Sequence, residues 1–229
     1  MNRELIVTRN LTKTYEDNGV PVRAVRGVDM TVLPGEFTAL IGPSGSGKTT
    51  LLNLVSGLDS PTSGTILLNG TNIGDMPPRE LSAFRRNNIG FVFQAYNLIP
   101  VLTVEENVEY ILLLQGMKKK QRHQKVMEIL EKVGLEDCAH RLPSKLSGGQ
   151  QQRVAVARAM VARPLFILAD EPTANLDSVT SGRLLDMMKD LNEKTGMTYL
   201  FSTHDPRVME RARRILVVQD GLIVEDREQ

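Results

Sequence analysis

A glycine-rich run in the first quarter of the chain constrains the fold of these 229 residues more than any other feature. The run matches the pattern G-x-x-x-x-G-K-[ST] of loops that bind phosphate groups, and its members are Gly42, Pro43, Ser44, Gly45, Ser46, Gly47, Lys48, Thr49 and Thr50. Residues 36–41 are mostly apolar and read as a strand, and residues 49–55 read as a helix. Because strand, loop and helix form one supersecondary unit, we expect a phosphate site beside a sheet.

The residue types in this loop suit a triphosphate. Glycines allow the backbone to curl so that successive N–H groups point inward without Cβ atoms in the way. The helix that follows presents its positive end to an anion. Lys48 is placed to neutralise β- and γ-phosphate oxygens, and the Thr49 hydroxyl to bind Mg²⁺. The loop therefore predicts a nucleoside triphosphate ligand, but it leaves open a kinase, a GTPase, a motor or a transporter ATPase.

The composition is that of a globular protein with no strong charge bias. Hydrophobic residues make up 41% and charged residues 24% of the chain, and 28 basic residues face 27 acidic ones. Nucleic-acid binders usually carry a basic excess, so we expect no nucleic-acid partner. The single cysteine, Cys138, cannot form an intrachain disulfide, which favours a reducing compartment. No apolar run approaches a membrane span and the N-terminus has no signal-peptide pattern, so we expect a cytoplasmic protein without direct membrane insertion.

The order of apolar patterns predicts an α/β fold. Strand-like segments alternate with helix-like ones after the phosphate loop, which favours a mostly parallel sheet. Before the loop, residues 22–33 alternate loosely between apolar and polar types, as half-buried antiparallel strands do. Residues 215–218 and 222–224 are expected to pair as a hairpin across Asp220-Gly221. One helix is expected from Val104 to about Val133, because apolar residues recur there at helical spacing.

Acidic and polar residues follow three other predicted strands. Asp170 and Glu171 end the apolar stretch 165–169, while Gln94 and His204 each end a further strand. Ligands of α/β sheets bind beyond the carboxyl ends of the strands, so these side chains should meet the phosphate loop. Asp170 is suited to bind Mg²⁺ through a water, and Glu171 to orient or deprotonate an attacking water. His204 would lie near the γ-phosphate.

A further segment gives the chain a specific resemblance. Leu146-Ser147-Gly148-Gly149-Gln150 and the residues after it are similar to the signature sequence of ATP-binding cassette (ABC) ATPases. The other markers of that family occur in the same order along essentially the whole chain: Tyr15, residues 42–50, Gln94, Asp170-Glu171, Asn175-Leu176-Asp177 and His204. Details around residues 93–100 and 171–177 resemble the subfamily that serves lipoprotein release, macrolide efflux and cell division.

The resemblance implies a fold and a division of the chain. It implies a P-loop NTPase (RecA-like) core with a mostly parallel sheet, an N-terminal antiparallel β subdomain and an inserted α-helical subdomain. Residues 1–229 would then form one nucleotide-binding domain. Residues 1–94 and 163–229 would form the catalytic core with the β subdomain, and residues from about 95 to 162 the helical subdomain.

The resemblance also implies roles for the marker residues. Tyr15 would stack on adenine, and Gln94 would bind Mg²⁺ in a segment that faces a membrane permease. The hydroxyl and backbone N–H groups of residues 147–149, with Gln150 beside them, would bind the γ-phosphate of ATP on a second copy of the chain. Asp177 would communicate across this dimer. Two chains would thus enclose two ATP molecules, each with Mg²⁺, head to tail.

The function that the resemblance implies is ATP hydrolysis on behalf of a transporter. The chain would be peripheral on the inner face of the cell membrane, bound there through integral-membrane permease subunits. Export or extrusion of lipoproteins, peptides or drugs is the favoured output, and force transmission to envelope enzymes is the alternative. A DNA-maintenance ABC ATPase would need a long coiled-coil insertion, and a translation factor would need two cassettes; the sequence has neither.

Overall fold

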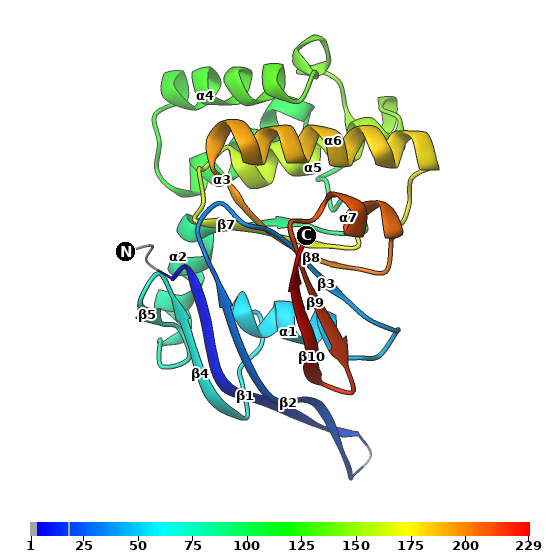
Figure 1. The fold of residues 1–229 in the computed structure, drawn as a ribbon. Helices are drawn as coiled ribbons and strands as arrows, with labels where there is room; N and C mark the ends of the chain where they lie inside the picture. The colour runs from blue at the N-terminus through cyan, green and yellow to red at the C-terminus, as the bar shows by residue number, and fades with distance from the viewer. Residues whose placement is uncertain (1–3, 18) are drawn as a thin grey trace.

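A computed structural model describes residues 4–17 and 19–229 as two sheets with helices between and above them (Figure 1). Residues 1–3 and 18, which belong to the domain expected from the sequence, lie outside the described residues. The smaller sheet has the antiparallel order β2-β1-β4-β5, and the larger sheet has the order β10-β9-β3-β8-β7-β6. Within the larger sheet β9, β3, β8, β7 and β6 run parallel, and β10 pairs antiparallel with β9. The expected α/β class is confirmed.

The smaller sheet comes from the first third of the chain. Its strands are β1 (Ile6–Asp17), β2 (Val20–Val32), β4 (Ser63–Leu68) and β5 (Thr71–Asn72). The apolar pattern predicts a strand over residues 5–8 only, but β1 continues to Asp17, with a shift of register against β2 between Thr8 and Leu11. Asn10 at that shift has a positive φ of 44°. A bulge of this kind inserts one residue and interrupts the alternation from which a strand is recognised.

The larger sheet consists of β3 (Phe37–Ile41), β6 (Ile89–Val92), β7 (Phe166–Asp170), β8 (Thr198–Thr203), β9 (Arg214–Gln219) and β10 (Leu222–Glu228). The last two strands form the hairpin that the sequence predicts. In β8 all six residues are buried, as expected of a strand that lies inside a parallel sheet covered on both faces. The strand β8 lies between β3, which leads into the phosphate loop, and β7, which ends in Asp170.

Two apolar cores lie on opposite faces of the larger sheet. One contains Leu40 of β3, Leu168 of β7 and Leu200 of β8, which pack with α1 (Lys48–Val55) and with the smaller sheet. The other contains the intervening residues Phe37, Ala39, Ile167, Tyr199 and Phe201, which pack with α3, α5 and α6. Because successive side chains of a strand point to opposite faces, each central strand contributes to both cores. The helix α1 is therefore enclosed between the two sheets.

Helices α3 (Val104–Leu114), α4 (Lys119–Lys132), α5 (Gly148–Met160) and α6 (Ser178–Thr195) lie together above the larger sheet (Figure 1). The remaining α-helices are α2 (Pro78–Asn88) and α7 (Pro206–Arg211). The prediction of one helix from Val104 to Val133 is wrong, since α3 ends at Leu114 and α4 begins at Lys119. Gly116 between them has φ 77°, a left-handed conformation that ends a helix. Across the described ranges 4–17 and 19–229, no helix has the length and apolar character needed to span a bilayer.

Candidate active site

A cleft of about 560 Å³ opens where several parallel strands end. The phosphate loop lines it, together with Gln94 after β6, Glu171 after β7 and His204 after β8. Strands β6, β7, β8 and β3 run parallel, so their carboxyl ends meet at one edge of the sheet. The structure thus brings together four parts of the site that the sequence predicts from separate segments.

The phosphate loop is tightly enclosed at its end. Gly47, the residue before α1, has φ 103°, and a Cβ atom there would lie 2.4 Å from the carbonyl oxygen of Ala24, so only glycine fits. The Nζ atom of Lys48 donates to the carbonyl oxygens of Gly42 and Pro43, each at 2.9 Å. The hydroxyl of Ser46 is buried without a hydrogen-bond partner among the described residues. A buried polar atom of this kind needs a partner, and a phosphate oxygen in the loop would supply one.

Oxygen atoms suited to a divalent cation lie at the start of α1 and the end of β7. The hydroxyl of Thr49 lies 3.4 Å from Oδ1 of Asp170, and Gln94 lines the same cleft. Among residues 4–17 and 19–229, no three His, Cys, Asp or Glu side chains form a metal cluster. Hydroxyl, carboxylate and amide oxygens, completed by phosphate oxygens and water, are the ligands that Mg²⁺ takes at nucleotide sites.

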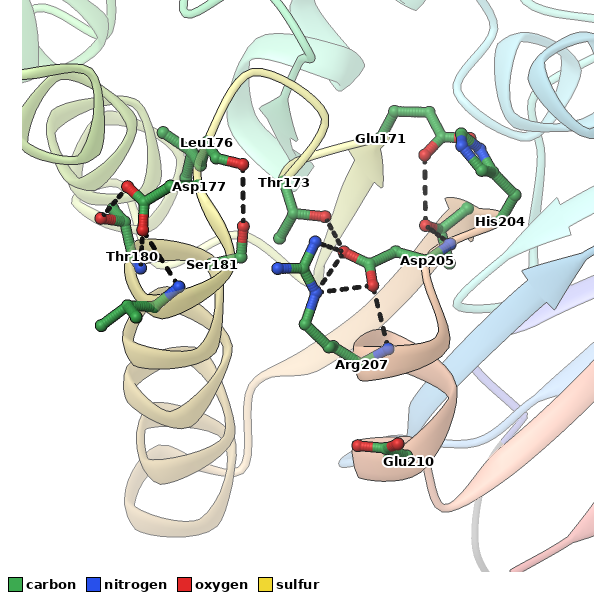
Figure 2. Close-up of polar contacts among 12 residues, drawn as sticks. Glu171, Thr173, Leu176, Asp177, Thr180, Ser181, His204, Asp205, Arg207 and Glu210 are labelled. Carbon is green, nitrogen blue, oxygen red and sulfur yellow. Dashed lines mark hydrogen bonds and ion pairs between the residues drawn. The ribbon is translucent and has the colours of Figure 1, made fainter.

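Glu171 has an unusual backbone and two side-chain partners. Its φ is 46°, a conformation that non-glycine residues adopt rarely and that is common at functional sites. Its N–H donates to the carbonyl oxygen of Ser202 at 2.9 Å, which fixes the turn against β8. Figure 2 shows its carboxylate directed at His204, with Oε1 2.7 Å from the imidazole Nδ1. The carboxylate of Glu171 is therefore already oriented by the protein.

The segments after β6 and β7 are joined by two amides: Asn175, one of the family markers, and Gln152, to which the sequence pattern assigns no role. The Nδ2 atom of Asn175 donates to the carbonyl oxygen of Gln94 at 2.9 Å. Gln152 in α5 is fully buried, and its Nε2 donates to the carbonyl oxygens of Phe93 at 3.2 Å and of Pro172 at 2.8 Å. The only sign of this role in the sequence is that Gln152 is a polar residue among the apolar positions of α5. These bonds connect the helices above the sheet to the cleft.

The signature residues begin α5 and lie outside the lining of the cleft. Ser147 caps the helix: its hydroxyl accepts from the N–H of Gln150 at 3.3 Å, and Gln150 Oε1 accepts from the N–H of Ser147 at 2.9 Å. This reciprocal pair is a capping box, which the order Ser-x-x-Gln signals in the sequence. Ser147 is exposed and Gly148 and Gly149 are half-buried, and the first N–H groups of a helix have no partner within it, so an anion can bind at this helix end.

The two signature glycines pack against other parts of the chain. A Cβ atom at Gly148 would lie 2.8 Å from the hydroxyl of Tyr96, and one at Gly149 would lie 2.3 Å from Cγ2 of Thr180. A side chain at either position would therefore have to displace Tyr96 or Thr180, a packing reason for glycine that the sequence pattern does not reveal. Thr180 in turn donates to Asp177 Oδ2 at 2.6 Å (Figure 2).

Asp177 caps the N-terminus of α6. Its Oδ1 accepts from the N–H groups of Val179 and Thr180 at 3.0 and 2.9 Å. The Thr180 hydroxyl and these N–H groups hold the pKa of Asp177 below its ordinary value. Because Thr180 contacts both Asp177 and the Cα region of Gly149, the segments 147–150 and 177–180 form one surface.

Tyr15 lies outside the lining of the cleft but is tied to the phosphate-loop helix. Its hydroxyl donates to Asp59 Oδ2 at 2.7 Å, and Lys13 Nζ lies 2.6 Å from Asp59 Oδ1. The ammonium of Lys13 also lies 4.8 Å from the centre of the Tyr15 ring, within the range of a cation–π contact. Burial and the bond to Asp59 raise the pKa of the Tyr15 hydroxyl. Asp59 follows α1, so these contacts fix the ring relative to the phosphate loop; nothing in the sequence pattern indicates Asp59.

Comparison with known proteins decides the family. The family model described as ABC transporter matches residues 25–174. The chain belongs to the ABC transporter ATP-binding family. It is accordingly an ABC ATPase, and its fold agrees with that of solved cassettes. "Dimeric Structure of MJ0796, a Bacterial ABC Transporter Cassette" is similar with a TM-score of 0.89 and 41% identity, over 98% of each chain.

Relatives of this ABC ATPase fall in the subfamily that its sequence resembles. "Lipoprotein-releasing system ATP-binding protein LolD" of Legionella pneumophila (strain Lens) is 44% identical over 96% of this chain and 97% of that protein. "Macrolide export ATP-binding/permease protein MacB" of Hyphomonas neptunium (strain ATCC 15444) is 44% identical over 99% of this chain. The ABC ATPase spans only 35% of the length of that second relative.

Proposed function

We propose that this ABC ATPase hydrolyses ATP to power the export or extrusion of a lipoprotein, peptide or drug through a separate membrane permease. The observation that carries the proposal is the division of the site. The phosphate loop, Gln94, Glu171 and His204 line one cleft, whereas residues 147–150 lie outside its lining, with Ser147 exposed and the other three half-buried. A chain built in this way can complete its nucleotide site with the signature surface of a second copy.

Residues of the cleft would bind ATP as follows. The backbone of residues 42–47 would surround the phosphates, with Lys48 neutralising the β- and γ-phosphate oxygens and Thr50 continuing the first turn of α1. Tyr15, fixed by Asp59, would stack on adenine. Thr49, Asp170 and Gln94 would hold Mg²⁺, which neutralises charge on the phosphate oxygens when it is bound. The close approach of Thr49 to Asp170 supports this assignment.

Glu171 would orient the attacking water and accept its proton, because its carboxylate lies in the cleft with one oxygen next to His204. His204 would keep this carboxylate in place and approach the γ-phosphate. Lys48 would stabilise negative charge on the transferred group. Catalysis of phosphoryl transfer depends mainly on such positioning and charge stabilisation, and a general base adds about 10²–10⁴-fold in rate.

A head-to-tail dimer would complete the site. The Ser147 hydroxyl, the N–H groups of Gly148 and Gly149, and Gln150 would contact the γ-phosphate on the second copy, with Asp177 beside them. The contact between Gly149 and Thr180, which bonds Asp177, supports a shared surface. A similar solved structure, 41% identical, is described as a "post-hydrolysis state of the ATP-binding cassette MJ0796 bound to ADP and Pi" and as dimeric. ATP binding would close the dimer and hydrolysis would reopen it.

A groove at the edge of the larger sheet would receive the permease, at the cytoplasmic face of the membrane. It encloses about 270 Å³ beside β6 and includes Phe91, Phe93, Tyr110 and Arg158. The rings of Phe91 and Phe93 stack with centroids 5.4 Å apart. Phe93 precedes Gln94, so a segment in this groove would act directly on the cleft. The groove lies between the catalytic core, residues 1–94 and 163–229, and the helical subdomain of residues 95–162 that we propose.

The test of the dimer is sedimentation of Glu171→Gln with saturating Mg-ATP. We expect a dimer with ATP and a monomer with ADP. Adding Ser147→Arg should abolish the dimer while ATP still binds, whereas Ser82→Arg on exposed α2 is the matched control and should leave it intact. A monomer for Glu171→Gln at saturating Mg-ATP would contradict the two-chain site. The coupling partner is tested separately by co-purification of an integral-membrane protein, which Phe91→Asp should prevent.

A further inference from the structure

The segments that follow β7 and β8 are joined by two reciprocal hydrogen bonds. The hydroxyl of Thr203 donates to Oε2 of Glu171 at 3.2 Å, and the hydroxyl of Thr173 donates to Oδ2 of Asp205 at 2.6 Å. In each segment a threonine and a carboxylate lie two residues apart, in opposite order along the chain. Figure 2 shows Thr173 directed at Asp205, next to Glu171 and His204. Each segment thus supplies one donor and one acceptor to the other.

The Thr173–Asp205 bond is buried and the Thr203–Glu171 bond is partly buried, whereas the contact of Glu171 with His204 is exposed. Thr203 has no exposed surface, Thr173 is 2% exposed and Asp205 is 8% exposed. The side chain of His204 is 76% exposed. Breaking a buried hydrogen bond costs more free energy than breaking an exposed one, since no water replaces the missing partner. Thr203 is therefore the fixed partner of the Glu171 carboxylate, and His204 is the partner that a nucleotide or a second chain can displace.

The direction of the Thr203 bond is set by its neighbours. The N–H of Asp205 donates to the Thr203 hydroxyl oxygen at 3.0 Å, so the single hydroxyl proton is left for Glu171. Asp205 itself accepts from the Arg207 N–H at 2.9 Å and from the Arg207 guanidinium at 2.8–3.1 Å. These bonds hold the Asp205 carboxylate in the position where it accepts from Thr173.

We propose that Thr203 is a positioning residue for ATP hydrolysis, supported by Thr173 and Asp205. It orients the Glu171 carboxylate toward the attacking water before His204 acts. The proposal rests on the function of Glu171 proposed above. Glu171 needs such support because its backbone is in the left-handed region, with φ 46°, where a non-glycine residue persists only if its surroundings fix it.

The test compares Thr203→Val with Thr198→Val. Thr198 begins β8, as Thr203 ends it, and is 1% exposed; its hydroxyl accepts from the N–H of Gly35 at 2.8 Å. Both variants lose a buried hydroxyl that accepts a backbone N–H, but only Thr203 contacts Glu171. We expect Thr203→Val to lower kcat at least about tenfold, a part of what a general base contributes. The KM for ATP and equilibrium binding of a fluorescent ATP analogue should remain near parent values, and Thr198→Val should keep the parent kcat.

A second measurement shows whether Thr203 acts through Glu171. In the Glu171→Gln background, measured in single-turnover conditions, Thr203→Val should cause no further loss of rate, because residues that act as a unit are non-additive. An equal loss in both backgrounds would overturn the proposal. If Glu171→Gln alone hydrolysed ATP at the parent rate, the assignment of Glu171 would fail instead, so the two failures are distinguishable.

Thr203→Ser and Thr173→Val keep the test valid if Thr203→Val does not fold. Thr203→Ser retains the hydroxyl donor and should recover most of the kcat that Thr203→Val loses. Thr173→Val removes one bond to Asp205, which keeps those from Arg207, so it should fold and lower kcat without changing ATP binding. Parent kcat in folded Thr173→Val and folded Thr203→Val would overturn the proposal, as would a Thr203→Ser variant no more active than Thr203→Val.

Discussion

Nδ1 of His204 lies 2.7 Å from Oε1 of Glu171, and the histidine is largely exposed while the carboxylate is 19% exposed. The imidazole therefore lies between the Glu171 carboxylate and solvent. The chain contains a second pair with the same geometry, since Nδ1 of His123 lies 2.6 Å from Oε1 of Glu105. That pair joins α4 to α3, away from the residues that line the cleft.

The first prediction follows from these two pairs. His204→Ala should lower kcat by about 10–100-fold, because Glu171 loses a partner in the cleft, while ATP binding persists. His123→Ala, which breaks the other pair, should leave kcat at the parent value. Phosphate release and nucleotide binding, measured on both variants, check the prediction. Equal rates for the two variants would show that the contact with Glu171 has no part in hydrolysis.

The second prediction concerns the aromatic ring beside α1. Stacking of a base on an aromatic ring contributes ~1–3 kcal/mol, so Tyr15→Ala should weaken ATP binding roughly 5–150-fold at tenfold per 1.4 kcal/mol. Binding of inorganic tripolyphosphate should not change, since the ring would contact only the base. Tyr15→Phe keeps the ring but loses the bond to Asp59, and should bind ATP with intermediate affinity. A parallel loss of tripolyphosphate binding would rule out a role confined to the base.

The third prediction concerns packing at the signature glycine. A methyl group at position 149 would lie 2.3 Å from Cγ2 of Thr180, so Gly149→Ala should lower the free energy of unfolding by about 1–3 kcal/mol, the usual cost of overpacking. Adding Thr180→Ser removes Cγ2 while keeping the hydroxyl that bonds Asp177. The double variant should recover most of the lost stability in urea denaturation. No difference between the single and double variants would contradict the steric account.

The fourth prediction concerns acid stability. Burial opposes ionisation of Asp205, but hydrogen bonds from Arg207 and Thr173 more than offset it, and the pKa of Asp205 lies below its ordinary value. A lowered pKa in the folded state adds stability that is complete above the unfolded value of about 3.9 and is lost as the pH falls through the folded value.

Arg207→Met removes the main partner of Asp205, so it should be less stable than the parent at about pH 6, and the difference should narrow as the pH falls below about 4. Urea unfolding of both proteins across this range measures the difference. Arg211→Met, which breaks an ion pair with the exposed Asp186, serves as the control. A difference for Arg207→Met that stays constant with pH would contradict this account.

The sequence predicts the parts of the cleft that depend on local pattern. The loop at residues 42–50 needs glycine at fixed positions, and Glu171 and His204 each follow a strand that is apolar enough to recognise. These ends come together because the strands are parallel, and the strands are parallel because helices lie in the connections between them. The hairpin at Asp220-Gly221 is a two-residue signal of the same local kind.

The sequence does not predict contacts between distant residues or breaks within a periodic pattern. Asp59 reaches Tyr15 and Thr203 reaches Glu171 only after the sheets have formed, and no local pattern records either pairing. Gly116 divides the expected helix because its backbone is left-handed, yet the apolar spacing on its two sides remains helical. The groove beside Phe91 likewise depends on how α3 and α5 pack against β6.

The central claim is that Glu171 activates the water in an ATP site formed by the phosphate loop. Steady-state phosphate release by Glu171→Gln, measured with ATP binding on the same preparation, tests it most directly. We expect the rate to fall by roughly 10²–10⁴-fold while ATP binds as in the parent. Hydrolysis at the parent rate by a Glu171→Gln protein that binds ATP would contradict the claim.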